Sequence, residues 1–291
     1  MYKNKNGKLV LPKSTMMTGT FGTVNTVEPN WTVANGMVLI GQGQEGRIRA
    51  AFANANMKNL VAIKNFFELD EFQPDVYFSK SLAKFIPEHV PNVRSYNKNT
   101  GRMISNMYRG GSALDWLAKN ASEVDDNLMR SIILQVVGSL HRLSLLDPSF
   151  RHNDLHLGNV FIDDRYFMPK REVLYKYQVP YFDVRAIIAD FGYAADKVHP
   201  LDPFKETPDY GIVRGNDKMY DTHFFLSATL GAINRLNIKA PATRAFLERA
   251  VPVEYRGKST RYVDNFRLAV GVKYPKSFDD IPVSYTHLTL P

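Results

Sequence analysis

Short apolar runs separated by Gly, Asn and other polar residues dominate the first third of the chain, whereas longer stretches with helical spacing dominate the rest. Short runs of this kind predict strands, and they lie at 37–40, 47–53, 60–64 and 103–108. The segment 127–146 carries Leu, Ile, Val and Met at every fourth position in two adjacent stripes. This spacing predicts a buried helix.

Further elements are expected on both sides of this helix. We expect 66–85 to be helical at least from Pro74, because proline suits the first helical position, with Gln73 as its cap. The segments after residue 146 are predicted to form two strands, a Tyr-rich hairpin-like arm and a last helix, at 160–163, 185–189, 166–182 and from Tyr220 onward. Together these elements indicate an α+β protein with a small β-rich first part and a larger, mainly helical second part.

One continuous architecture is expected, because no internal repeat and no low-complexity segment interrupts the chain. Residues 1–35 are polar and rich in Thr and Asn, so we expect an irregular extension there. The folded part divides into a first lobe at 36–108 and a second lobe at 109–282. The segment 283–291 resembles the peptide made when a sequencing-library adapter is translated in frame. We therefore exclude it from the fold and expect other residues to follow in the natural protein.

The chain is basic, since 37 Lys and Arg against 29 Asp and Glu give a formal charge of +8. This balance suits polyanionic ligands such as nucleotides, nucleic acids or acidic membrane surfaces, without choosing among them. The absence of cysteine excludes disulfides, a thiol nucleophile and thiolate metal sites. No apolar run is long enough to span a bilayer, and the Lys-rich start lacks the apolar core of a signal peptide. We therefore expect a cytoplasmic protein with no membrane partner.

A glycine-rich stretch follows the first predicted strand, with Gly41, Gly43 and Gly46. Glycines let a backbone approach phosphates closely, because no Cβ intrudes and exposed amides can point inward. A dinucleotide site of the Rossmann type would need a helix to open at the third glycine. A strand is predicted there instead, so the three glycines indicate a phosphate-covering loop of another kind.

The strand predicted after this loop, at 47–53, is followed by a further strand at 60–64. This strand ends with Val61-Ala62-Ile63-Lys64, and here the sequence begins to resemble protein kinases. In that family a glycine loop covers the phosphates of ATP, and the lysine on the third strand holds the α- and β-phosphates. The resemblance implies this role for Lys64 and a phosphate-binding role for the glycine loop. Outside this context, such a lysine would be interpreted as a solvated side chain at a strand end.

The segment from His152 to Asn159 resembles the kinase catalytic loop, which carries an Asp and, five residues on, an Asn. The resemblance implies that Asp154 accepts the proton of the acceptor hydroxyl and that Asn159 binds magnesium. Asp190 and Phe191, followed by Gly, resemble the metal-binding triplet, in which the Asp bridges magnesium to the phosphates. Carboxylate and amide oxygens are the ligands that Mg²⁺ prefers. ATP and Mg²⁺ are therefore the implied cofactors.

A zinc site is the competing interpretation of this segment, because His152 and His156 are four residues apart and would share one face of a helix. The usual glutamate of such zinc motifs is missing, Asn153 stands next to the first histidine, and Gly158 would break the helix. We therefore interpret His152 as a packed core histidine behind the catalytic loop.

Two positions of the loop depart from the protein-kinase pattern. Asn153 replaces the Arg that pairs with a regulatory phosphate, so the resemblance implies no switch of that kind. His156 replaces the Lys of Ser/Thr kinases that neutralises the transferring phosphoryl group, and this position belongs to the implied catalytic set. The Asp-Leu-His order is more similar to aminoglycoside and choline phosphotransferases. With the Tyr-rich insertion before the triplet, it is also similar to kinase-like proteins of large DNA viruses.

The acidic partner of Lys64 and the support of the loop remain open at this stage. Asp75 resembles the helix acid that pairs with the lysine in small-molecule kinases, and Glu71 is the fallback. An Asp in this place is also simply favoured in the first turn of a helix. Asp221 resembles the buried aspartate that anchors the catalytic loop from below, although a helix N-cap would explain it equally well.

The ordered set of motifs implies a two-lobed protein-kinase-like fold, with the N-lobe at 36–108 and the C-lobe at 109–282. It also implies an adenine site, with Asn106 at the start of the hinge and Phe161 on the adenine floor. The specificity lies in the order of the motifs, because each of them alone is short enough to occur by chance.

The expected activity is transfer of the γ-phosphoryl group of ATP to a hydroxyl, with a protein Ser or Thr as the first choice of acceptor. A small-molecule kinase is the alternative, which His156 favours. A nucleotide-binding pseudokinase scaffold is the third possibility, and the retained lysine, aspartates and asparagine argue against it. The basic charge permits a nucleic-acid partner, but no recognition module supports one. If the chain is viral, its expected place is the cytoplasm of the host cell; the oligomeric state stays open.

Overall fold

The computed structural model describes residues 2–3, 9–10, 34–42, 46–52, 60–164, 171–174, 177–180, 184–201, 219–253 and 256. Most of the expected extension at 1–35 and all of 257–291 lie outside the described residues. The chain divides into two compact units, Met1–Ala83 with Pro91–Met107 and Lys84–Val90 with Tyr108–Pro291. We call these unit 1 and unit 2 and describe each by itself.

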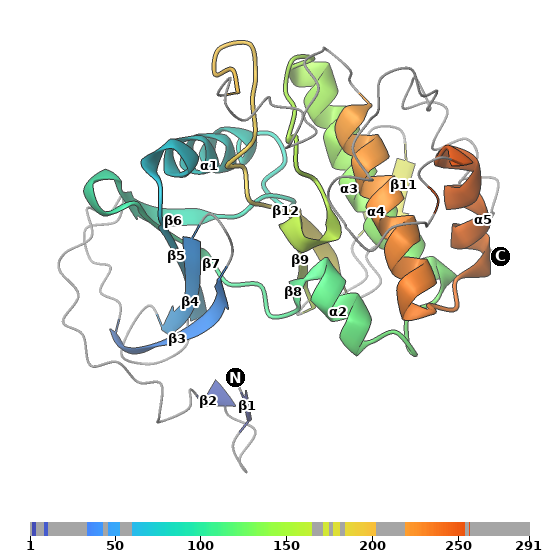
Figure 1. Cartoon of the computed structure of the whole chain (residues 1–291), viewed down its shortest axis with the longest axis horizontal. Coiled ribbons are helices and arrows are strands. Elements are labelled where there is room, and N and C mark those ends of the chain that lie inside the picture. The colour runs from blue at the N-terminus through green and yellow to red at the C-terminus, as the bar shows by residue number, and fades with distance from the viewer. Residues whose placement is uncertain are drawn as a thin grey trace. The chain divides into compact units, whose positions relative to one another are not determined.

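Unit 1 contains a five-stranded antiparallel sheet in the order β3-β4-β5-β7-β6 (Figure 1). Its strands are β3 (Ala34–Gln42), β4 (Gly46–Phe52), β5 (Leu60–Phe66), β6 (Val93–Asn97) and β7 (Arg102–Asn106). The four strands predicted from apolar runs are confirmed, although β3 begins earlier and β7 ends earlier than expected. β6 was not predicted. A separate short pair, β1 (Tyr2–Lys3) and β2 (Leu9–Val10), lies near the N-terminus.

Helix α1 (Leu69–Leu82) packs on this sheet. It begins five residues before Pro74, so the prediction that Gln73 caps it was wrong; Glu68 occupies the cap position. The early start is explained by packing, because Phe72 in the first turns lies edge-on against Phe66 of β5 with ring centroids 5.5 Å apart. Burial of this aromatic pair favours the helical turn before the proline.

Unit 2 is mainly helical, with a small three-stranded sheet in the order β12-β9-β8. Its helices are α2 (Ala113–Lys119), α3 (Asp126–Leu146), α4 (Tyr220–Leu236) and α5 (Pro241–Ala250). The sheet strands are β8 (Gly111–Ser112), β9 (Val160–Asp163) and β12 (Arg185–Ile188). The predicted strands, the long helix and the last helix from Tyr220 are confirmed. The chain thus has mixed α and β content, with its sheets in limited regions.

The predicted Tyr-rich arm contains an antiparallel hairpin of β10 (Arg171–Leu174) and β11 (Tyr177–Pro180). Both strands of the hairpin lie next to α3. The rest of the arm at 165–170 and 181–183 lies outside the described residues.

Helix α3 forms the centre of unit 2, since its apolar stripe is buried. A buried polar side chain, Gln135, connects it to the sheet: its Nε2 donates to the carbonyl of Val184, and its Oε1 accepts from the backbone N–H of Ala186. Asp126, the first residue of α3, accepts the backbone N–H groups of Ala242 and Thr243 and thereby caps α5. Helices and sheet are therefore joined by polar contacts as well as by the core.

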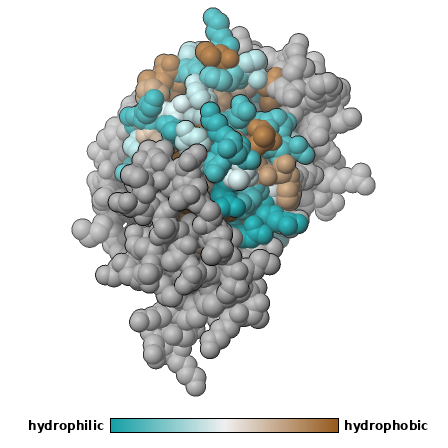
Figure 2. All heavy atoms as spheres, turned by 90° about the vertical axis from the view of Figure 1, so that its left-hand side faces the viewer, coloured by the Kyte–Doolittle hydropathy of each residue, from teal (hydrophilic) through white to brown (hydrophobic). Residues whose placement is uncertain are grey.

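On the face drawn in Figure 2, the described residues are mainly hydrophilic, with hydrophobic residues in separate spots. The large apolar side chains exposed on the described part of unit 1 are Phe67, Leu69 and Tyr77. Scattered exposure of this kind is normal for a folded protein. In the part of the chain that the structure describes, no helix has the length and apolar character needed to cross a membrane.

Candidate functional site

Lys64 on β5 forms a buried ion pair with Asp75 of α1. Its Nζ lies 2.9 Å from Oδ2 of Asp75, and the two residues are only 8% and 1% exposed. Ser79, one turn further along α1, donates to Oδ1 of the same carboxylate at 3.3 Å. The ammonium group also lies over the ring of Phe66, 4.4 Å from its centroid. Asp75 is therefore the acidic partner that the geometry favours over Glu71.

The support from Ser79 was missed in the sequence. Its signal is the spacing of four residues between Asp75 and Ser79, which puts both side chains on one face of a helix.

Of the three glycines, Gly41 belongs to β3 and Gly46 begins β4. Gly41 pairs with Ile48 in the sheet, and Gly43 lies outside the described residues. A Cβ on Gly46 would come within 2.3 Å of the carbonyl oxygen of Asn65 on β5. The close packing of β4 on β5 is therefore enough to require a glycine at position 46, independently of any role in phosphate binding.

In unit 2, Asp221 of α4 holds the backbone of the catalytic-loop segment. Its two carboxylate oxygens accept the N–H groups of His152 and Asn153 at 2.7 and 2.8 Å. The N-cap position of α4 belongs to Met219, and no side chain caps it. The alternative that Asp221 serves as a helix N-cap was therefore wrong. The carboxylate is 6% exposed, so these two hydrogen bonds are made away from water.

Asn153 adopts a left-handed backbone conformation, with φ of 65°. Its amide Nδ2 donates to the carbonyl oxygen of Tyr193 at 2.8 Å. Asparagine is one of the few non-glycine residues that tolerate this conformation. The residue thus shapes the turn before Asp154 and ties it to the segment after the Asp190 triplet.

His152 is a core residue, as expected. It is fully buried, its Nε2 lies 3.0 Å from the carbonyl oxygen of Ala189, and its ring packs on Phe191 with centroids 5.1 Å apart. Phe191 is fully buried too. The zinc alternative finds no support, because the segment forms only a short 3-10 turn at Leu157–Asn159 (η3). Among the described residues there is also no group of three His, Cys, Asp or Glu side chains that could hold a metal ion.

Asp154 and Asn159 lie in direct contact. Nδ2 of Asn159 donates to the carbonyl oxygen of Asp154 at 2.9 Å and approaches its carboxylate Oδ2 at 3.1 Å. These two bonds orient the side-chain amide, and its oxygen Oδ1 takes no part in them.

Asp190 lies at the same end of the strand pair as Asn159. Asn159 precedes β9 and Asp190 follows β12; the two strands pair antiparallel, and the backbone N–H of Ala189 donates to the carbonyl of Asn159 at 2.9 Å. Asp190 has a left-handed φ of 67°. Non-glycine residues held in this region often occur at functional sites. Unit 2 thus brings Asp154, Asn159 and Asp190 together in one region.

His156 turns back over its own loop. Its Nδ1 accepts the backbone N–H of Gly158 at 2.9 Å, and its Nε2 lies 3.6 Å from Oδ2 of Asp154. The edge-to-face partner of the ring is Phe224 of α4, with centroids 6.2 Å apart. The imidazole is partly exposed and belongs to the same cluster as the proposed proton acceptor.

The two residues expected at the adenine site lie in different units, Asn106 in unit 1 and Phe161 in unit 2. Asn106 ends β7 in unit 1, and its Oδ1 accepts from Nε of Arg94 at 2.8 Å. The chain passes from unit 1 to unit 2 between Met107 and Tyr108, within the expected hinge stretch. Phe161 lies half-buried on β9, between β8 and β12. The adenine roles of both residues stay predictions.

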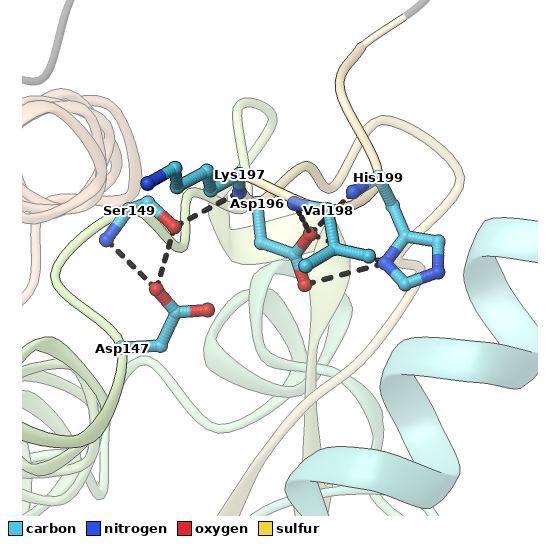
Figure 3. Close-up of polar contacts among 6 residues, drawn as sticks. All are labelled: Asp147, Ser149, Asp196, Lys197, Val198 and His199. Atoms are coloured by element: carbon cyan, nitrogen blue, oxygen red, sulfur yellow. Dashed lines mark hydrogen bonds and ion pairs between the residues drawn. The ribbon is translucent and has the colours of Figure 1, made fainter.

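The segment after the triplet is fastened to the turn that follows α3 (Figure 3). Ser149 Oγ donates to Oδ1 of Asp147 at 2.6 Å and accepts the backbone N–H of Lys197 at 2.9 Å. Asp196 Oδ1 accepts the backbone N–H of His199 at 2.5 Å and also contacts the imidazole of that residue. These contacts hold the chain just after the region of Asp190.

One further histidine of unit 2 has a strongly altered acidity. His223 of α4 is 3% exposed, and burial lowers its pKa to about 4 from an ordinary value of 6.5. The ring is thus neutral at physiological pH, with Nε2 3.5 Å from the hydroxyl of Ser227. It lies two residues after Asp221, on the helix that supports the loop.

No protein-family model matches the chain. The sequence is similar to a putative serine/threonine-protein kinase of Acanthamoeba polyphaga mimivirus, with 21% identity over 322 residues. The alignment covers 93% of this chain and 67% of that protein. This distant similarity supports a kinase-like relationship.

Proposed function

We propose that this chain is an ATP- and Mg²⁺-dependent phosphotransferase with a two-lobed protein-kinase-like fold, and that it acts on a protein Ser or Thr. The observation that carries the proposal is the cluster of Asp154, Asn159 and Asp190 at one end of the β9–β12 pair. The buried anchor Asp221 holds the backbone beside this cluster. Within unit 1, the buried pair of Lys64 and Asp75 supports the proposal, because the kinase resemblance assigns to this lysine the phosphates of ATP.

The proposed reaction is a direct displacement at phosphorus. The acceptor hydroxyl oxygen forms a bond to the γ-phosphorus, and the bond from that phosphorus to the β,γ-bridging oxygen breaks, so that ADP leaves. Asp154 orients the hydroxyl and takes its proton. A general base of this kind contributes about 10² to 10⁴ in rate.

Asn159 Oδ1 and the Asp190 carboxylate would hold Mg²⁺, and both are hard oxygen ligands. When bound, the ion neutralises charge on the β- and γ-phosphates. Lys64 would hold the α- and β-phosphates, because its ammonium group is kept in place by Asp75. Gly41, Gly43 and Gly46 would cover the phosphates with backbone amides.

A small-molecule acceptor is the second candidate, and the observation that favours it is His156 in the place of the Lys of Ser/Thr kinases. The first candidate is favoured by the similarity to the mimivirus protein and by the order of the motifs. A pseudokinase scaffold is the third candidate, and the retention of Lys64, Asp154, Asn159 and Asp190 argues against it.

Transfer of labelled phosphate from ATP, with and without Mg²⁺, to a protein mixture and to a panel of small alcohols tests this proposal. Asp154→Asn is expected to lower the rate by about 10² to 10⁴. Asp164→Asn is the matched control, because Asp164 is an exposed carboxylate next to β9. Equal labelling by wild type and Asp154→Asn would refute the mechanism, and the panel that is labelled identifies the acceptor class.

A further inference from the structure

We propose that His156 is a positioning residue for Asp154: the backbone of Gly158 fixes its imidazole as the Nε2–H tautomer, and the ring directs this N–H at the Asp154 carboxylate. The inference rests on the proposed function and deepens it, since it states how this chain orients its proton acceptor where Ser/Thr kinases carry a lysine.

The tautomer follows from the hydrogen bond to Gly158. A backbone N–H only donates, so the ring nitrogen 2.9 Å away must offer a lone pair and carry no proton. In a neutral imidazole the proton then sits on the other nitrogen, Nε2. An imidazolium would place two donors face to face at this distance. With the Gly158 contact in place, Nδ1 is the acceptor and Nε2 is the ring nitrogen that carries the donor hydrogen.

The ring position is built into the loop. A Cβ on Gly158 would lie 2.6 Å from Cε1 and 2.8 Å from Nδ1 of His156, so only glycine leaves room for the imidazole. The described glycines with positive φ are Gly101 and Gly111, so Gly158 is not required by its backbone conformation. The imidazole thus occupies space that a side chain at position 158 would need, and Phe224 makes an edge-to-face contact with the ring.

Nε2 of His156 lies near one particular carboxylate oxygen of Asp154. It lies 3.6 Å from Oδ2 of Asp154, the same oxygen that Nδ2 of Asn159 approaches at 3.1 Å. The imidazole contact is longer than a hydrogen bond and acts as a dipole directed at a charge. Catalytic hydrogen bonds are often long without substrate and tighten in the reactive complex. Asn159 thus holds Oδ2 by a hydrogen bond, and the imidazole of His156 lies on the same oxygen at a longer distance.

Two substitutions separate this role from a purely structural one. His156→Asn keeps an acceptor for the Gly158 N–H, because asparagine is a strong cap, but has no group that reaches Asp154. His156→Gln keeps an N–H donor at about the reach of Nε2 and loses the cap. We expect His156→Asn to lower kcat by about 10- to 100-fold with an unchanged KM for ATP. We expect His156→Gln to retain more of the activity.

A third substitution moves the ring without removing it. Gly158→Ala is expected to displace the imidazole and to lower kcat to the level of His156→Asn. His199→Asn is the matched control, because the His199 imidazole is exposed and outside the cluster and the substitution keeps the bond from the His199 backbone N–H to Asp196; it should leave kcat unchanged. Urea unfolding of each variant shows whether a loss of activity reflects a loss of fold.

The ¹⁵N chemical shifts of the His156 imidazole give a measurement that needs no activity. We expect an unprotonated Nδ1 and a protonated Nε2, assigned by the loss of these signals in His156→Gln. A protonated Nδ1, or an active His156→Asn beside an inactive His156→Gln, would overturn this inference alone. A wild type that transfers no phosphate to any acceptor would overturn the proposed function and the positioning role together.

Discussion

Replacement of Asp221 by Asn is the perturbation that tests most directly how the catalytic-loop segment is held. In the structure, the two oxygens of this carboxylate accept one backbone N–H each, from His152 and Asn153. The amide of Asn offers one oxygen and one NH₂ group. One backbone N–H therefore keeps an acceptor, while the other faces a donor. The shape of the side chain is otherwise unchanged.

The magnitude follows from burial. Leaving one buried donor without an acceptor costs about 1 to 3 kcal/mol, and a hydrogen bond to a charged group contributes about 1.5 to 3 kcal/mol. Asp221 is 6% exposed, so water cannot replace the lost partner. Because these two terms overlap, we expect the free energy of unfolding to fall by about 2 to 4 kcal/mol. Phosphate transfer should fall by about 10²-fold, since a small displacement of Asp154 is enough for such a loss.

Urea unfolding followed by far-UV circular dichroism measures the stability term. Asp164→Asn is the control for the change of charge and should remain within about 0.5 kcal/mol of wild type. An Asp221→Asn protein as stable as this control would show that the loop does not depend on the carboxylate. Normal phosphate transfer by Asp221→Asn would refute the link between loop position and rate.

Two further predictions follow from the burial of ionisable side chains. Lys64→Met should destabilise the protein by about 3 to 5 kcal/mol because it leaves the Asp75 carboxylate buried without its cation. In urea unfolding, the double variant Lys64→Met with Asp75→Leu should recover part of this loss. A double variant less stable than Lys64→Met would contradict a pairwise interaction between the two side chains. Burial lowers the pKa of His223 to about 4, so below pH 6.5 the unfolded chain takes up a proton that the folded chain refuses, and stability falls as the pH drops from 6.5 to 4. This contribution reaches about 3 kcal/mol, and His223→Gln should remove it from the pH dependence of unfolding whereas His199→Gln should not.

Regular elements were predictable where one strong local pattern decides them. The four-residue spacing of apolar side chains gave α3, and the apolar run Val160–Asp163 gave β9. β6 escaped prediction because Arg94 and Asn97 interrupt its short apolar pattern, and the strand exists through pairing with β7. α1 started earlier than its proline suggested, because the burial of Phe72 outweighs a weak local start signal.

The site shows the same division between local and distant information. Short motifs identify Lys64 and Asp154, since each lies in a recognisable string of neighbours. The choice between Asp75 and Glu71 depends on which carboxylate the turn of α1 brings to the lysine. The two bonds of Asp221 join residues almost seventy positions apart in the chain. The local motif left two roles open for Asp221, and only the folded arrangement decides between them.

The Asn at position 153 shows how a departure from a family pattern can still have a physical reason. The described residues include three non-glycine residues with positive φ, and two of them, Asn153 and Asp190, lie in the catalytic-loop segment and the triplet. Such a conformation costs about 1 to 3 kcal/mol and persists only where surrounding contacts enforce it. For Asn153 these contacts are the Asp221 carboxylate on its backbone N–H and the Tyr193 carbonyl on its side chain. Asparagine accepts the left-handed backbone more readily than arginine does and supplies the donor for Tyr193. Asn153 thus holds the turn before Asp154 through contacts that the chain itself supplies, one on its backbone and one on its side chain.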